Sequence, residues 1–196
     1  MKLNTPNILT LARIIITPIF LWTILSENLA HRFLIACIVF SIGAVTDALD
    51  GYLARKNNQI TNFGKFLDPI ADKVLTTSAL LAFMSMGLCN IWIVMIVLTR
   101  EFAIASVRMI AASNGVVIPA NIWGKIKTVT QMVFTITIML MGEAWELVAQ
   151  ADAELSAKLP DLSLVSNGLL WITAIFTVVS GVIYLIDSRK IIDYTK

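Results

Sequence analysis

The chain alternates between long apolar stretches and short polar segments. Six apolar stretches approach the length of about 20 residues that a helix needs to cross the hydrocarbon core of a bilayer. Their approximate bounds are 8–25, 33–53, 68–86, 91–113, 121–141 and 166–186. The pattern therefore predicts an all-α membrane protein with six transmembrane helices, organised as a single transmembrane domain over residues 1–196.

The composition supports this prediction. Hydrophobic residues make up 58% of the 196 residues and charged residues only 14%, whereas soluble domains are near half apolar and a quarter charged. The net charge of +2 comes with no acidic tail or long basic arm, so nothing indicates nucleic-acid binding. Cys37 and Cys89 lack the spacing of a metal site, and we interpret them as packing residues.

The placement of lysine and arginine predicts the orientation. If the N-terminus is cytoplasmic, the outer segments are 26–32, 87–90 and 142–167, and only Arg32 and Lys158 of the 15 basic residues lie there. Both termini are therefore expected in the cytoplasm. The acidic residues of the third outer segment are Glu143, Glu146, Asp152, Glu154 and Asp161.

Charged residues follow the second apolar stretch directly, in the sequence TDALDGYLAR. Asp47 and Asp50 are three positions apart, and Asp68 and Asp72 are four apart, so each pair lies on one face of a helix. Only the polar segment 56–63 separates the two helices. We expect the helices to be antiparallel neighbours whose acidic faces meet at the inner membrane face.

Four carboxylates brought together repel each other. At an effective dielectric constant of ~20, two like charges about 4 Å apart cost roughly 4 kcal/mol. Bound cations relieve this cost, and a dense set of carboxylate oxygens suits Mg²⁺, Mn²⁺ or Ca²⁺. A site with two such ions would also present Lewis-acid charge to a phosphate.

The residues between the aspartates fit a phosphate-containing ligand. Gly51, Ala54 and Gly64 are small enough to let a bulky ligand approach the backbone, and Arg55 suits a phosphate. Pro69 predicts that a helix begins near Asp68 and directs its positive end at anions. The alternative is that the aspartates pair at a solvated helix end with nearby cations, which are Arg55, Lys56, Lys65 and Lys73. That alternative does not explain the small residues.

The complete pattern of Asp47, Asp50, Gly51, Ala54, Arg55, Gly64, Asp68 and Asp72 resembles the signature of CDP-alcohol phosphotransferases, with every position filled at the spacing of that family. Further motifs look like those of its bacterial phosphatidylglycerophosphate synthases. These motifs are PNILTLARI at 6–14, DPIADK at 68–73, REFAIASVR at 100–108 and WGKIKTVTQM at 123–132. The resemblance covers most of the chain and is weakest over 142–167.

The resemblance implies a homodimer in the bacterial inner membrane with its active site facing the cytoplasm. It implies two divalent ions, Mg²⁺ or Mn²⁺, held by Asp47, Asp50, Asp68 and Asp72, with Asp72 also the general base. Gly51, Ala54, Arg55 and Gly64 would line the CDP site. The implied reaction joins CDP-diacylglycerol and glycerol 3-phosphate into phosphatidylglycerophosphate and releases CMP.

Glycerol 3-phosphate carries a phosphate of its own, which needs basic ligands. Arginines within membrane helices are costly and usually functional. The candidate ligands are Arg108, Lys125, Arg100 and Thr128, from the fourth and fifth apolar stretches. Glu101 is an alternative partner for Arg100. Lys127 points away from Lys125 on a helix, so a role in water or at lipid headgroups is equally open.

Several other residues have simpler interpretations. Thr10 and Arg13 would face either the CDP pocket or phosphates of the inner leaflet. His31 is expected at the surface of an outer turn. The five tryptophans lie near predicted span ends, where an interfacial belt accounts for them.

Three other functions compete with this prediction. A different acceptor within the family, serine or inositol phosphate, is one. Serine carries no phosphate, so the predicted ligands Arg108 and Lys125 argue against it. Inositol phosphate does carry one, and only the wider resemblance disfavours this acceptor. A cation transporter would explain four aspartates in a membrane but not the small residues beside them. A purely structural scaffold would not need the aspartates at all.

Overall fold

The computed structural model describes the backbone of residues 5–56, 62–113, 115 and 122–189. It describes the side chains of these residues except those of 5–9, 47–56, 62–69 and 72. The described chain forms six long helices and one short one. Their bounds are α1 Thr5–Leu25, α2 Arg32–Lys56, α3 Asn62–Ser85, α4 Ile91–Ser113, α5 Ile122–Ala151, α6 Ala153–Lys158 and α7 Leu162–Arg189. All six predicted apolar stretches are therefore confirmed as helices.

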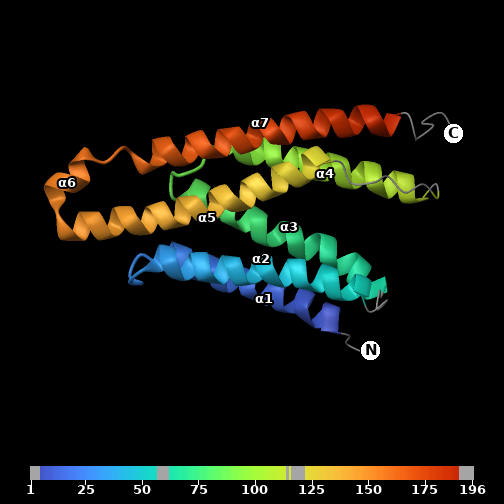
Figure 1. The fold of residues 1–196 in the computed structure, drawn as a ribbon, viewed down its shortest axis with the longest axis horizontal. Coiled ribbons are helices and arrows are strands. Elements are labelled where there is room, and N and C mark those ends of the chain that lie inside the picture. Colours follow the sequence, from blue (N-terminus) through green and yellow to red (C-terminus); the bar gives the residue numbers. More distant parts are fainter. Residues whose placement is uncertain (1–4, 57–61, 114, 116–121, 190–196) are drawn as a thin grey trace.

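The long helices form two groups that pack together lengthwise (Figure 1). In the N-terminal group, α1 packs against α2 and α3; in the C-terminal group, α7 packs against α4 and α5. Contacts of α5 with α2, and of α3 with α4 and α5, join the groups. The start of α1 and the end of α7 lie at the same end of the molecule as the end of α2 and the start of α3, the two helices joined by the α2–α3 connection (Figure 1). We call this the signature end, because the predicted aspartates flank that connection.

The hydrophobic core is concentrated away from the signature end. Its fully buried members include Phe20 of α1, Phe40 of α2 and Phe83 of α3, which pack with Ile93 and Ile138 from the C-terminal group. The phenyl rings of Phe20 and Phe40 have centroids 5.6 Å apart. Because lipid chains are as apolar as these side chains, helix association in a membrane depends on the van der Waals packing of such large rings and branched groups rather than on their removal from water.

Polar side chains are buried in the other half of the bundle. The buried positions of α5 and α7 include a run of polar residues at helical spacing, namely Lys127, Gln131, Thr135, Thr173, Thr177, Ser180 and Ser188. Several hydroxyls donate to carbonyl oxygens of their own helix, as Thr177 does to Thr173 at 2.7 Å. Buried polar groups of this kind face the interior of a bundle and mark functional regions in membrane proteins.

The predicted outer segment 142–167 is largely helical, which corrects the sequence-based boundaries. The fifth helix ends at Ala151 rather than near 141, and the last begins at Leu162 rather than near 166. The acidic residues of this segment explain the difference. Asp152 caps α6 by accepting hydrogen bonds from two backbone amides, and Asp161 accepts one from the amide of Ser163 at 2.9 Å.

Two glutamates on the extended part of α5 hold the turn between α1 and α2. Oε1 of Glu143 lies 2.5 Å from Nδ1 of His31. Its Oε2 accepts a hydrogen bond from the backbone amide of Leu34 at 3.1 Å. Oε1 of Glu146 forms an ion pair with Nη2 of Arg32, at a distance of 2.7 Å. The expected surface position of His31 is confirmed, since its side chain is 56% exposed. Its partner on α5 was not predicted.

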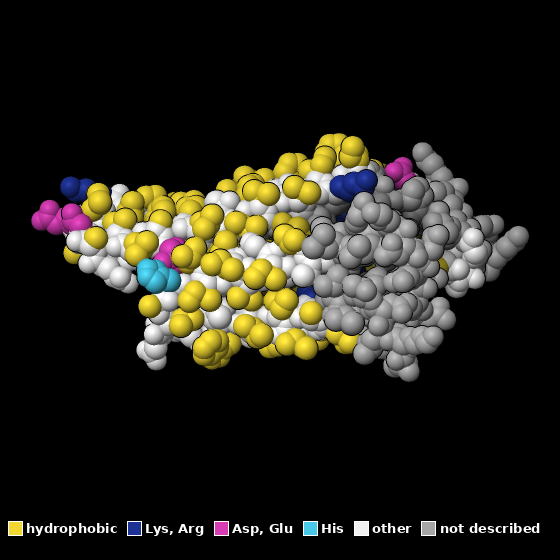
Figure 2. All heavy atoms as spheres, turned by 60° about the horizontal axis from the view of Figure 1, so that its bottom comes forward, with side chains coloured by type: hydrophobic (Ala, Val, Ile, Leu, Met, Phe, Trp, Pro, Cys, Tyr) yellow, Lys and Arg dark blue, Asp and Glu magenta, His cyan; other side chains and the backbone are white. Residues whose placement is uncertain are grey.

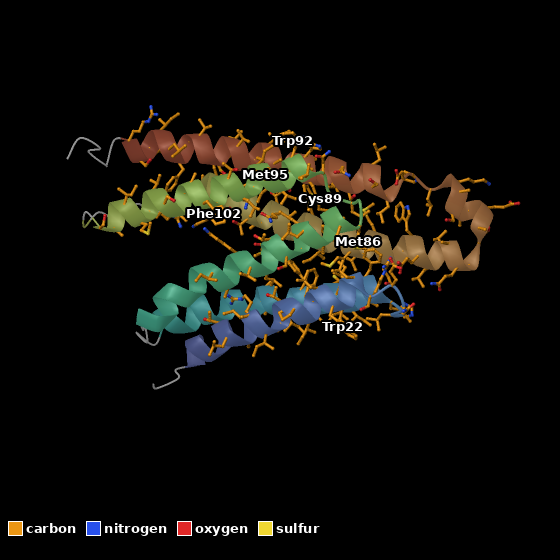
Figure 3. All side chains as sticks on the ribbon, turned by 180° about the vertical axis from the view of Figure 1, so that it is seen from behind. Trp22, Met86, Cys89, Trp92, Met95 and Phe102 are labelled. Atoms are coloured by element: carbon orange, nitrogen blue, oxygen red, sulfur yellow. The ribbon has the colours of Figure 1, made fainter. Side chains whose placement is uncertain are left out.

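The outer surface is rich in exposed hydrophobic side chains, which cover most of the described part of the face in Figure 2. Trp22 on α1 is 65% exposed, and Trp92 and Phe102 on α4 are 67% and 65% exposed (Figure 3). Within the described residues, α5 and α7 are long and apolar enough to cross a membrane, and shorter apolar segments lie in α1, α2 and α3. Such a surface is consistent with a membrane protein.

The packing of α2 against α5 makes a stability prediction at Gly142. A Cβ atom there would lie 2.7 Å from ring carbons of Phe33, which is buried. We expect Gly142→Ala to destabilise the protein by roughly 1–3 kcal/mol, because the ring must move within a packed core. The measurement is the fraction of detergent-solubilised protein that stays monodisperse after heating.

Gly168→Ala on α7 is the matched control. Gly168 is exposed, and a Cβ there would meet nothing within 4 Å. Alanine should be neutral or slightly stabilising here, by up to about 1 kcal/mol, because it is the better helix former. Equal heat resistance of the two variants would contradict the close contact at Gly142.

Candidate active site

The four signature aspartates lie on the two helices that lead into and out of the connection at the signature end. Asp47 and Asp50 belong to the second half of α2, and Asp68 and Asp72 to the first half of α3. Helices α2 and α3 contact each other, so the prediction that they are neighbours is confirmed. The side chains of these aspartates, and of Gly51, Ala54, Arg55 and Gly64, lie outside the described ones.

One expectation about these residues is wrong. Helix α3 begins at Asn62 rather than near Asp68, so Pro69 lies inside the helix and not in its first turn. Asp68 and Asp72 therefore extend from the body of a helix. The positive end of the helix dipole is almost two turns away from Asp68, and the dipole falls off within the first turn.

The described residues next to the aspartates show very close packing of α1, α2 and α3. A Cβ atom at Gly43 would lie 2.7 Å from Cδ2 of Leu75 and 3.5 Å from Cγ2 of Ile16. Gly43 precedes Asp47 by about one helical turn, and Leu75 follows Asp72 by slightly less than one turn. The absence of a side chain at Gly43 leaves room for the Leu75 side chain of α3 against the α2 backbone, one turn from the predicted metal ligands.

Thr10 and Arg13 on α1 are buried in the same region. Each side chain is only 1% exposed, and Nε of Arg13 donates a hydrogen bond to the backbone oxygen of Gly43 at 3.3 Å. Such burial argues against the alternative in which these residues bind lipid headgroups. Arg13 instead places a guanidinium against the α2 backbone near the signature.

A second cluster surrounds Glu101, in the middle of α4. Its Oε1 accepts hydrogen bonds from Nζ of Lys127 at 2.7 Å and from Nη1 of Arg100 at 3.0 Å. Its Oε2 lies 3.8 Å from Nζ of Lys73, and that ammonium also donates to the backbone oxygen of Glu101 at 3.2 Å. Cations from α3, α4 and α5 thus converge on one carboxylate.

Lys127 is the largest departure from the sequence-based expectation. It is 4% exposed, so the interpretations in water or at lipid headgroups are wrong. A signal for this was present in the sequence. Lys127 shares a helical face with Gln131, Thr135 and Gly142, and such a mixed polar and small face within an apolar stretch indicates the interior of a bundle.

Arg100 lies between α5 and α7. Besides its bond to Glu101, it donates from Nη2 to the hydroxyl of Ser180 at 3.1 Å. Two glycines leave room for it, since a Cβ at Gly124 would lie 3.3 Å from Nη2 and a Cβ at Gly181 would lie 3.1 Å from Cγ. The predicted alternative partner, Glu101, is confirmed, and the guanidinium is held by hydrogen bonds to α4 and α7.

Arg108 lies about two turns further along α4 and is exposed. Its Nε donates to the hydroxyl of Tyr184 at 3.2 Å, and its guanidinium lies 5.5 Å from the centre of that ring. Tyr184 itself is buried, so it orients an arginine that still has free surface. Neither Tyr184 nor Ser180 was predicted, because a hydroxyl on a distant apolar helix carries no local signal.

Lys125 and Thr128 are both exposed. The hydroxyl of Thr128 donates to the backbone oxygen of Gly124 at 3.1 Å, which is a bond within its own helix. The structure thus joins Arg100 with Lys127 through Glu101, and leaves Lys125 and Thr128 on the surface of α5. A site that holds several cations in fixed positions, with others exposed nearby, can bind an anionic ligand.

The cysteines take no part in either cluster. Both belong to the buried hydrophobic core, and Cys89 lies at the turn between α3 and α4 (Figure 3). Burial raises the pKa of the Cys89 thiol to about 12, so it stays protonated. Their interpretation as packing residues is confirmed.

Comparison with known proteins connects these features. The chain is 39% identical to CDP-diacylglycerol–glycerol-3-phosphate 3-phosphatidyltransferase of Bacillus subtilis (strain 168), over 91% of each chain. It is 37% identical to the protein of that name from Haemophilus influenzae, over 94% of this chain and 93% of the relative. It is 33% identical to the protein of that name from Rickettsia bellii, over 95% of this chain and 96% of the relative.

A family model agrees with these relatives. The model that describes CDP-alcohol phosphatidyltransferases matches residues 3–180, which include both the signature aspartates and the cluster around Glu101. Nearly the whole chain therefore takes part in the match. The chain belongs to the CDP-alcohol phosphatidyltransferase family.

Proposed function

We propose that the protein transfers the phosphatidyl group of CDP-diacylglycerol to glycerol 3-phosphate, forming phosphatidylglycerophosphate and CMP. The observation that carries this proposal is the similarity to relatives named for that reaction, at 33–39% identity over 91–95% of the chain. The complete aspartate signature supports it independently.

The aspartates fit a site for two divalent ions, Mg²⁺ or Mn²⁺. Asp47, Asp50, Asp68 and Asp72 would hold the ions, because hard carboxylate oxygens are the ligands that such ions prefer. The contact of the Leu75 side chain of α3 with Gly43 of α2 supports a shared site beside it. When bound, the ions would supply Lewis-acid charge to the diphosphate.

The rest of the nucleotide site would come from neighbouring positions. Gly51, Ala54 and Gly64 would leave space for the CDP group, and Arg55 would pair with a phosphate. Thr10 would add a hydroxyl from α1, and its burial one turn before Arg13 supports this placement. The glycines would let the nucleotide approach the helices closely.

The reaction needs a base and a leaving group. A hydroxyl of glycerol 3-phosphate forms a new bond to the lipid-side phosphorus, and the bond from that phosphorus to the CMP oxygen breaks, so that CMP leaves with the electron pair. Asp72 accepts the hydroxyl proton. The remaining residues orient the two substrates, and positioning contributes most of the rate in phosphoryl transfer.

The acceptor phosphate would bind to the cations of α4 and α5. Arg108 is the leading candidate, because it is exposed and yet oriented by Tyr184. Arg100 is held in a fixed position near Lys127, and Lys125 and Thr128 are exposed on α5. Bidentate hydrogen bonding favours arginine for this role.

The membrane arrangement forms part of the proposal. The protein would be a single domain over residues 1–196 that crosses the bacterial inner membrane six times, with both termini and the active site at the cytoplasmic face. The location of the start of α1 and the end of α7 at the signature end supports it (Figure 1). The family resemblance adds a homodimer, checkable from the mass of the solubilised protein.

The first test is a panel of acceptors. Purified protein is mixed with CDP-diacylglycerol and glycerol 3-phosphate, inositol phosphate or serine, with Mg²⁺ or with a chelator. We expect CMP only with glycerol 3-phosphate and only with the metal. CMP with serine but not glycerol 3-phosphate would overturn the acceptor, and no CMP with any acceptor would favour the transporter.

Asp72→Asn tests the general base. We expect a folded protein whose turnover at saturating Mg²⁺ falls by about 100-fold or more, since the amide cannot accept the proton. The dependence on Mg²⁺ concentration separates this loss from the loss of a metal ligand, which more metal would partly restore. Asp152→Asn is the control, because asparagine also caps a helix well. Near-normal turnover of Asp72→Asn would remove Asp72 from this role.

Arg108→Gln tests the phosphate ligand. We expect the KM for glycerol 3-phosphate to rise roughly ten- to hundredfold, the usual effect of losing a hydrogen bond between charged groups. The KM for CDP-diacylglycerol should stay unchanged in initial-rate measurements. Arg189→Gln, at an exposed position in the last turn of α7, is the matched control. Equal KM values for both variants would exclude Arg108.

A further inference from the structure

Glu101 is the one described side chain on which cations from three different helices converge. Its contacts lie between the signature helix α3 and the helices proposed to bind the acceptor. We propose that Glu101 is a positioning residue that sets the geometry of the acceptor site through Lys127 and Arg100. This inference rests on the proposed function and identifies how its acceptor site is kept in place.

The first support is the burial of Lys127. A buried ammonium is strongly disfavoured unless a carboxylate compensates it. The side chain of Lys127 is 5% exposed, and Oε1 of Glu101 lies 2.7 Å from its Nζ. Without the negative charge, the buried ammonium of Lys127 would be uncompensated and would move away from this position, which removes a fixed positive charge beside Arg100.

The second support is the shared oxygen. The same Oε1 also accepts from Nη1 of Arg100, whose Nη2 donates to Ser180 on α7. One carboxylate oxygen therefore determines the relative position of an ammonium from α5 and a guanidinium from α4. Outer partners of this type typically orient the groups that touch a ligand.

The third contact, with Lys73, indicates which substrate site a substitution of Glu101 would affect. Lys73 directly follows Asp72, and it reaches Glu101 mainly through the backbone oxygen at 3.2 Å, with Oε2 at 3.8 Å. A substitution of the side chain leaves that backbone oxygen in place. Loss of the carboxylate should therefore disturb Lys127 and Arg100 far more than α3, and so the acceptor site more than the nucleotide site.

Glu101→Gln is the test, measured as initial rates of CMP release in lipid–detergent micelles with each substrate varied in turn. We expect the KM for glycerol 3-phosphate to rise about tenfold, while the KM for CDP-diacylglycerol stays within about twofold. Glu101→Asp retains the charge on a shorter side chain and should restore part of the affinity, leaving a rise of about threefold.

The matched control is Glu146→Gln, which removes a glutamate charge from an ion pair with Arg32 on the far side of the bundle. We expect it to change heat resistance at most, with both KM values as in the wild type. If Glu101 were only structural, Glu101→Gln would behave in the same way as this control. That result would overturn the inference.

Two further experimental results also have a defined interpretation. If Glu101→Gln does not fold, the Asp variant decides, and a KM for glycerol 3-phosphate within about twofold of the wild type would overturn the inference. A wild-type protein that makes CMP only with another phosphorylated acceptor would contradict the proposed function alone. The role of Glu101 would then be measured with that acceptor and judged by the same comparison.

Discussion

The structure depends on compensating the few charges that lie inside a bundle with an apolar outer surface. Three of the described charges inside the bundle have specific polar partners. Lys127 and Arg100 share a carboxylate oxygen of Glu101, and Glu143 receives a backbone amide and an imidazole. The desolvation penalty of an unpaired charge is several kcal/mol. These contacts therefore restrict how the helices can pack more strongly than the apolar contacts do.

The two halves of the bundle differ in the side chains that they bury. The half around Phe20, Phe40 and Phe83 contains most of the described hydrophobic core, and the contacts of Glu143 with His31 and of Glu146 with Arg32 hold its end together. The other half buries hydroxyls and charges. Glycines allow this half to pack without large side chains, as at Gly43 between α2 and α3. A rigid apolar half can thus support a polar half whose side chains are available for chemistry.

The two proposed substrate sites come from different helix groups. The signature aspartates belong to α2 and α3, whereas Arg100, Arg108 and the lysines of α5 belong to the C-terminal group. The contact of Lys73 with Glu101 lies where the two groups meet. The relative position of nucleotide and acceptor would then depend on this junction, since a transfer reaction requires both reacting atoms within about 3–3.5 Å.

The sequence by itself determined the positions of the six long helices and the placement of the four aspartates on two neighbouring helices, because apolar runs and short polar connections are local properties of a chain. Only the tertiary structure decided where α5 ends, that Lys127 is buried, and that Tyr184 and Ser180 hold the arginines. Each of these depends on a partner from a distant helix: Glu143 and Glu146 bind the turn before α2, and Glu101 pairs with a lysine 26 residues away. A charge pattern read along one helix cannot reveal which carboxylate another helix brings to it.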